Sequence, residues 1–139
     1  MVRGIVRIHA STPALRYPAL LFLAGFLAHN SDHLRRGLAV LTPEVLWIGS
    51  LSGVITLAAI GLTLLNYRFS PLLAVAVGFG MALGVSIVHL LPRWSAFSDS
   101  LVQANADAFT WLAVLAELSG ALVFALAGLR LAYPTKATR

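Results

Sequence analysis

Long apolar stretches, separated by short polar segments, divide the chain into four parts. Each stretch has roughly 20 residues, the length that an α-helix needs to cross the hydrocarbon core of a membrane. We therefore predict an all-α integral membrane protein whose four transmembrane helices form an up-down-up-down bundle. The predicted spans cover approximately residues 17–41, 44–66, 71–91 and 109–131, within a single domain of residues 1–139.

Signals for helix starts support these boundaries. The segment Thr42–Glu44 supplies an N-cap, a proline at the first helical position and an acidic residue in the first turn. Ser70 and Pro71 repeat this arrangement, and Asn105 or Asp107 can cap the last helix. Because the first three helices are joined by short connections, neighbouring helices should run antiparallel.

The composition agrees with a lipid environment. Of the residues, 59% are hydrophobic and only 11% are charged, whereas a soluble domain has about 25% charged residues. The sequence contains no cysteine, which excludes disulfides and thiolate metal sites. The net charge of +5 is not arranged as basic runs with interleaved aromatic residues, so we expect no nucleic-acid partner.

The distribution of basic residues predicts the orientation, because cytoplasmic segments of membrane proteins are enriched in Lys and Arg. Three basic residues fall on one side of the predicted bundle: Arg35, Arg36 and Arg93. Seven fall on the side of the termini: Arg3, Arg7, Arg16, Arg68, Arg130, Lys136 and Arg139. Both termini are therefore predicted to be cytoplasmic.

Aromatic residues mark the same span ends, as they do at membrane interfaces. The tyrosines fall at the cytoplasmic ends and the tryptophans at the outer ends: Tyr17, Tyr67 and Tyr133, and Trp47, Trp94 and Trp111. Nine arginines against one lysine are typical of GC-rich bacterial genes, so we expect a bacterial inner (cell) membrane. Cleavage of a signal peptide after Ala28 is disfavoured, since bulky Phe26 would occupy the −3 position.

Five ionisable side chains are predicted to lie at similar depth in the outer half of the bundle. His29, Asp32 and His33 share one face of the first span. His89 is near the outer end of the third span, and Glu117 is about 12 Å below the outer end of the fourth, at 1.5 Å per residue. If the polar faces turn inward, these groups converge on one pocket. Ionisable groups inside membrane spans usually mark a functional site.

The residue types in this pocket are those of a metal centre. We predict His29, His33 and His89 as nitrogen ligands, with Asp32 or Glu117 as a further ligand or as a hydrogen-bond partner of a histidine. Without cysteine, such a site suits Zn, Fe, Mn or Cu. In an enzyme, Asp32 would serve as a base and Glu117 as a proton acceptor, acting on a lipid-like or small substrate.

The two arginines at the outer end of the first span have two interpretations. Arg35 and Arg36 can extend to lipid headgroups, or they can bind an anionic cofactor or substrate beside the metal. The connection over residues 93–107 is expected to be an outer interfacial loop. The helical spacing of Trp94, Phe97 and Leu101 favours a short amphipathic helix there, covering the mouth of the pocket.

Three alternatives to a metal-dependent enzyme remain open. His29 or His33 could pair with His89 around a b-type haem in an electron-transfer subunit. The buried charges could instead serve an ion-coupled carrier, or a non-catalytic accessory subunit in which they fix the register of the helices. Besides membrane lipid, we expect a second copy of the chain or a larger membrane complex as a partner, joined through the faces that carry Gly49-x3-Gly53 and Gly80-x3-Gly84.

Overall fold

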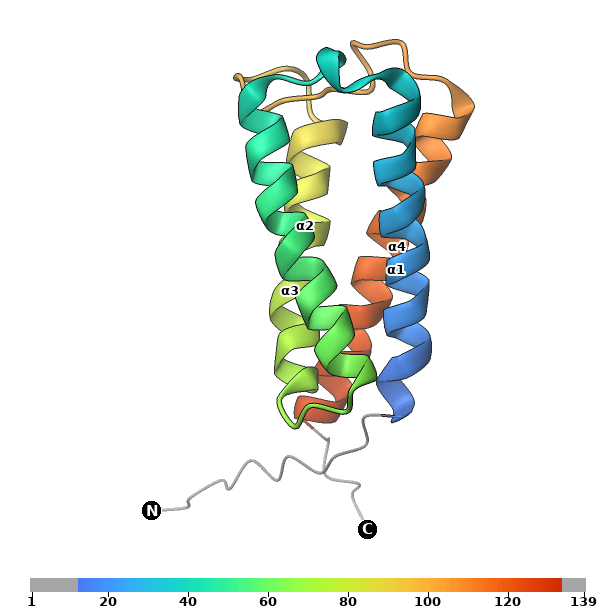
Figure 1. The fold of residues 1–139 in the computed structure, drawn as a ribbon, viewed down its shortest axis with the longest axis vertical. Coiled ribbons are helices and arrows are strands. Elements are labelled where there is room, and N and C mark those ends of the chain that lie inside the picture. The colour runs from blue at the N-terminus through green and yellow to red at the C-terminus, as the bar shows by residue number, and fades with distance from the viewer. Residues whose placement is uncertain (1–12, 134–139) are drawn as a thin grey trace.

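The computed structural model describes residues 13–133, and this part of the chain is helical without strands. Four long helices are joined by two short connections and one longer loop (Figure 1). The elements are α1 (Pro13–Arg36), the 3-10 turn η1 (Leu38–Val40), α2 (Pro43–Leu64), α3 (Ser70–Val85), its π-helical continuation η2 (Ser86–Leu90) and α4 (Ala108–Ala132). The predicted all-α fold is confirmed, with boundaries within a few residues except where α1 ends at Arg36 rather than near residue 41.

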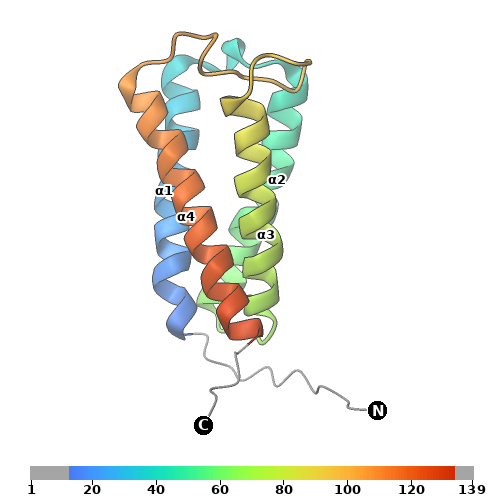
Figure 2. The ribbon, with the colours of Figure 1, turned by 180° about the vertical axis from the view of Figure 1, so that it is seen from behind.

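The helices alternate in direction and form a four-helix bundle (Figures 1 and 2). α4 packs closely on both α1 and α3, whereas α2 completes the bundle through less extensive contacts with α1 and α3. The connection through η1 and the loop over residues 91–107 cross one end of the bundle, which we call the loop end. The opposite end, where α1 begins and α4 ends, is the terminus end.

Three of the four predicted spans are long and apolar enough to cross a membrane: Pro43–Leu64, Ser70–Leu90 and Ala108–Ala132. α1 differs because polar residues occupy its last two turns, from His29 to Arg36. Its 24 residues nevertheless give a length of about 36 Å, and it lies beside α4 over this length (Figure 2). We therefore treat α1 as a fourth span whose polar groups are satisfied inside the bundle.

Close contacts between helices depend on glycine. A Cβ atom added at Gly25 of α1 would lie 2.6 Å from backbone atoms of Ala116, and one at Gly120 of α4 would lie 2.7 Å from Cα of Phe22. At the α3–α4 contact, a Cβ atom at Gly78 would lie 2.6 Å from the carbonyl oxygen of Ala121. These distances leave no space for a side chain, so glycine allows the backbones to approach closely.

The glycine pairs predicted to mediate close helix contacts have a different environment. A Cβ atom added at Gly49, Gly80 or Gly84 would meet nothing within 4 Å, and at Gly53 it would meet only the ring of Phe26, at 3.3 Å. These pairs therefore do not mediate close packing within the chain, where the backbones that approach most closely are those of α4 and its two neighbours. Homodimerisation through these faces stays a prediction.

Two of the predicted helix caps are present. Thr42 Oγ1 accepts a hydrogen bond from the backbone N–H of Val45 at 3.2 Å, and Asp107 Oδ1 accepts one from Thr110 at 2.9 Å. The N–H of Thr110 lowers the pKa of the Asp107 carboxyl below its ordinary value. Ser70 does not act as the predicted cap, because it is already the first residue of α3 and its hydroxyl donates to the carbonyl of Tyr67 at 2.6 Å.

The glycine contacts predict a position-dependent effect of a single methyl group. Gly120→Ala should destabilise the bundle by about 1–3 kcal/mol, because the new Cβ overlaps the backbone of α1. Gly84→Ala is the matched control, since its Cβ meets open space. Thermal unfolding of the two purified variants in the same detergent measures the difference. An equal effect of both substitutions would contradict the packing role of Gly120.

The predicted orientation can be tested by cysteine labelling because the natural sequence contains no cysteine. Ala104 is exposed at the loop end and Tyr67 is exposed at the terminus end. In intact cells, a membrane-impermeant maleimide should label the Ala104→Cys variant and should label Tyr67→Cys only after the cells are opened. The reverse pattern would place both termini outside the cytoplasm.

Candidate metal centre

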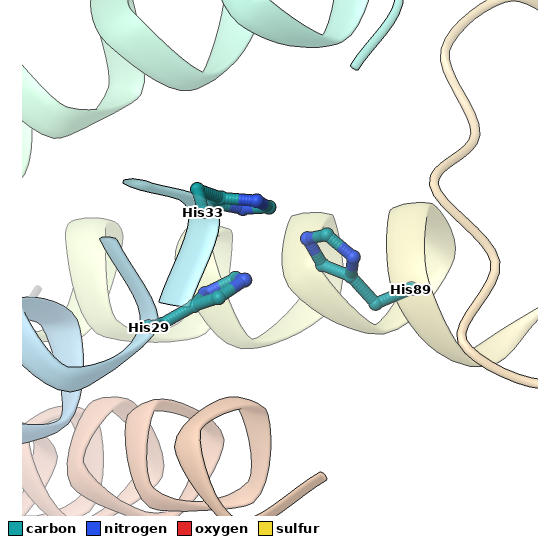
Figure 3. Close-up of side chains that lie close together, drawn as sticks. All are labelled: His29, His33 and His89. Atoms are coloured by element: carbon teal, nitrogen blue, oxygen red, sulfur yellow. The ribbon is translucent and has the colours of Figure 1, made fainter. Parts of the chain in front are cut away.

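Three histidines meet near the loop end of the bundle. The rings of His29 and His33 come from α1 and the ring of His89 comes from η2, and all three point toward a common space (Figure 3). One ligand nitrogen from each residue lies within 4.8 Å of the others. The ring centroid of His29 lies 4.6 Å from that of His33 and 4.7 Å from that of His89. The predicted convergence of the first and third helices is therefore present.

Local backbone structure explains how these rings come together. His29 and His33 are four residues apart and therefore project from the same face of α1, one turn apart. His89 lies in a π-helical turn, which is wider than an α-helical turn and is often found at functional sites. The helix ends immediately afterwards, where Leu91 is extended and Pro92 follows. Pro92 indicated the end of the helix in the sequence, but the π-helical turn before it was not predicted.

Glu117 connects the histidine cluster to α4. The Glu117 side chain is buried, and its carboxylate contacts Nδ1 of His29. Because a carboxylate accepts hydrogen bonds, this contact places the proton of a neutral His29 on Nδ1 and leaves the lone pair on Nε2. The Nε2 atom is buried and has no hydrogen-bond partner among the described residues. Glu117 thus lies where it can orient His29.

Asp99, which the sequence analysis did not select, is the second carboxylate at this cluster. Its backbone carbonyl accepts a hydrogen bond from His89 Nδ1 at 3.0 Å, and its Oδ2 atom lies 3.5 Å from the same nitrogen. This arrangement again leaves Nε2 as the free ring nitrogen of His89. The sequence indicated only that Asp99 is an acidic residue in the loop next to the predicted pocket. Loop residues follow no helical period, so the direction of this side chain could not be predicted.

The loop carries Asp99 into the bundle through backbone hydrogen bonds. The N–H of Asp99 donates to the carbonyl of Val88 at 3.0 Å, and the N–H of Leu101 donates to the carbonyl of His89 at 2.9 Å. The predicted amphipathic helix in residues 93–107 is wrong: this segment forms turns joined by irregular backbone, and Leu101 is buried in the core. Two of its backbone N–H groups bond to carbonyls of η2, and others bond within the loop, so no helix is needed to satisfy them.

Asp32 is placed among arginines and not among the histidine ligands. Its side chain is fully buried, and its two oxygens pair with Arg35 at 2.7 Å and with Nε of Arg36 at 3.1 Å. Both partners lie on α1, three and four residues away. Asp32 therefore neutralises the two arginines. Its carboxylate is not part of the cluster formed by the three histidines.

Arg35 and Arg36 are held by carboxylates of the chain. Arg35 pairs with Asp107 at 2.8 Å and donates to Thr110 at 3.1 Å, so it links α1 to the start of α4. Arg36 pairs with Asp99 at 2.9 Å, so it links α1 to the loop. The predicted binding of an anionic cofactor by these arginines would have to compete with these ion pairs.

His33 requires a different protonation pattern from the other two histidines. Nη2 of Arg36 lies 2.9 Å from Nδ1 of His33, and a guanidinium can only donate, so this nitrogen is the acceptor. A neutral His33 then carries its proton on Nε2. If a metal binds at Nε2, that proton has to move to Nδ1, where Oδ2 of Asp99 lies 4.0 Å away and can accept a hydrogen bond after a small shift.

A cavity of about 510 Å³ adjoins the histidine cluster, between α1, α2 and α3. Most of its lining residues are apolar, and the polar side chains in its wall include the three histidines and Glu117. The space continues past Gly49, Gly80 and Gly84, which explains why these glycines have open surroundings. The histidine cluster is therefore accessible from a space large enough for a small molecule.

The geometry is close to that of a three-histidine metal site. Zinc–nitrogen distances of about 2.1 Å place tetrahedral ligand nitrogens about 3.4 Å apart, and the observed nitrogens already lie within 4.8 Å. Three protein ligands leave one coordination position free, as in catalytic metal sites.

Comparisons with protein-family models, with curated proteins and with solved structures find no match to this chain. The histidine cluster therefore has to be interpreted from its own geometry.

Proposed function

We propose that this chain is a membrane protein that binds one divalent transition-metal ion through His29, His33 and His89. The observation that carries the proposal is the convergence of three ligand nitrogens within 4.8 Å, next to an apolar core. Glu117 and Asp99 serve as hydrogen-bond partners that orient His29 and His89.

Burial favours a metal over hydrogen bonding among the histidines alone. Nε2 of His29 is a buried acceptor with no hydrogen-bond partner in residues 13–133, and such an atom costs about 1–3 kcal/mol when it stays unsatisfied. A bound ion would satisfy this lone pair together with that of His89. Interhelical polar contacts that serve only packing would not require three imidazoles to face one space.

The ligand set limits the ion and its chemistry. Three imidazoles with neighbouring carboxylates and no thiolate suit Zn, Cu, Fe or Mn. A free fourth position facing the cavity would allow the ion to polarise a bound oxygen atom or to activate water. We therefore propose metal-dependent chemistry on a small or lipid-like substrate. We also propose that the centre lies in the outer half of a bacterial cell membrane, an orientation that the distribution of basic residues supports.

The convergence of three histidines also distinguishes an ion from haem. A b-type haem has two axial positions, so the third imidazole at similar distance would have no ligand role. Each of His29 and His89 also has a carboxylate or carbonyl acceptor at Nδ1, which is the arrangement typical of histidines that bind a metal ion.

Metal analysis of purified protein provides the direct test. We expect about one zinc or other transition-metal ion per chain after loading and removal of excess metal, and the loss of most of this metal in His29→Ala and His89→Ala. His9→Ala is the matched control, because it removes the fourth histidine of the sequence and leaves the three cluster histidines unchanged. Wild-type protein without bound metal, or with a haem absorption band, would contradict the proposal.

The role of Asp99 can be separated from that of the ligands. Asp99→Asn keeps the backbone carbonyl that accepts from His89 but removes the carboxylate charge 3.5 Å from Nδ1 of His89 and 4.0 Å from Nδ1 of His33. We therefore expect about tenfold lower metal affinity, the lower end of the effect of changing a group that supports a ligand. Asp107→Asn is the matched control, because Asp107 pairs with Arg35 and does not contact the histidines. Competition with a metal-binding dye measures both affinities. Equal affinities of the two variants would mean that Asp99 only anchors the loop.

A further inference from the structure

The buried charges around the three histidines do not cancel one another. In residues 13–133, the Asp, Glu, Lys and Arg side chains that are not exposed are Asp32, Arg36, Asp99 and Glu117, each with at most 16% of its side chain accessible. Three of them are carboxylates and one is a guanidinium, so in the ionised state they carry an excess of two negative charges. Arg35 and Asp107 are both about half exposed and pair with each other, so they add no net charge.

A divalent ion on neutral histidines would supply the missing positive charge. The ligands lie between two of the carboxylates, since Glu117 contacts His29 and Oδ2 of Asp99 lies 3.5 Å from Nδ1 of His89. Charge that is buried without compensation is costly, which favours binding of two positive charges at this place. Once a divalent ion is bound, the buried groups together are neutral. No net positive charge then remains to attract an anion.

The wall of the cavity beside the histidines leads to the same conclusion. In the described part of the chain, no arginine or lysine lines this space, and besides the histidines its ionisable side chain is that of Glu117. Arg36 is held by Asp32 and Asp99 and is not part of the wall. The other polar side chains of the wall are uncharged: Asn30, Ser50 and Ser52. An anion in the cavity would therefore meet a carboxylate, and its attraction would come from the metal ion alone.

We infer that the free coordination position of the metal takes an uncharged ligand and that the site discriminates against anions. This inference rests on the proposed metal site and specifies its substrate class: a molecule that binds through a hydroxyl or carbonyl oxygen, not through a carboxylate or phosphate. A coordinated anion would give the buried groups a net negative charge, which is poorly screened where little water is present. Arg35 and Arg36 accordingly serve the carboxylates of the chain and not an anionic ligand.

Removing one buried carboxylate tests the inference, because it should convert the site into one that binds anions. Glu117→Gln removes the charge and keeps an amide oxygen that can accept a hydrogen bond from Nδ1 of His29. Asp32→Asn gives the same comparison at a buried residue outside the histidine cluster. Glu44→Gln is the matched control, since it removes an equal charge from an exposed side chain that does not line the cavity.

The probes are thiocyanate, a small anion, and pyridine, an uncharged ligand. Each purified protein is loaded with Co²⁺ in the same non-ionic detergent at one pH and one ionic strength. The visible absorption bands of the bound Co²⁺ change when its fourth ligand changes, so titrations give the affinity for each probe. Cobalt content is determined in parallel, and only the metal-loaded fraction is compared.

We expect Glu117→Gln and Asp32→Asn to bind thiocyanate about tenfold more tightly than wild type, because a buried unit charge acts strongly at short range. Their affinity for pyridine should change little, and Glu44→Gln should bind both probes like wild type. Equal thiocyanate affinity in wild type and in both buried-site variants overturns the inference about the ligand alone. Wild-type protein that binds no cobalt or other transition metal overturns the proposed function as well.

Discussion

The polar end of α1 is the constraint on which the arrangement of the loop end depends. It carries Asp32, Arg35 and Arg36 into a bundle whose other helices are apolar. In a membrane no water is available to satisfy such groups, so the protein has to supply their partners. The start of α4 supplies Asp107 to Arg35, and the loop supplies Asp99 to Arg36. The charges of α1 therefore hold the loop together with its backbone hydrogen bonds to η2.

Neutralising the arginines has a consequence for the histidines. Because carboxylates hold both guanidinium groups, Glu117 and the backbone of Asp99 remain as acceptors for the Nδ1 atoms of His29 and His89. The Nε2 atoms of these two rings are then left with their lone pairs facing the shared space. His33 is linked to the same network through Arg36. The charge network and the metal centre are therefore one structure, and a change in either affects the other.

The sequence allowed the helices and the depth of their polar residues to be predicted, because hydropathy and helical period determine both. His29, His89 and Glu117 meet as these rules require. Asp99 could not be found in this way, since a loop has no period and its direction depends on distant partners. The open surroundings of Gly84 could not be predicted either. The sequence does not show whether a glycine on a helix face packs against another backbone or lines a cavity.

The close contact at Gly25 relates the packing of the bundle to the chemistry of the site. A Cβ atom at this position would lie 2.6 Å from the backbone of Ala116 and from the N–H nitrogen of Glu117. His29 follows Gly25 by one helical turn on the same face of α1, so the contact sets the height at which Glu117 meets His29. A larger residue would separate α1 from α4 exactly where this buried pair forms. Glycine at position 25 thus allows the Glu117 carboxylate to reach the imidazole of His29. That contact in turn directs Nε2 of His29 toward the other two histidines.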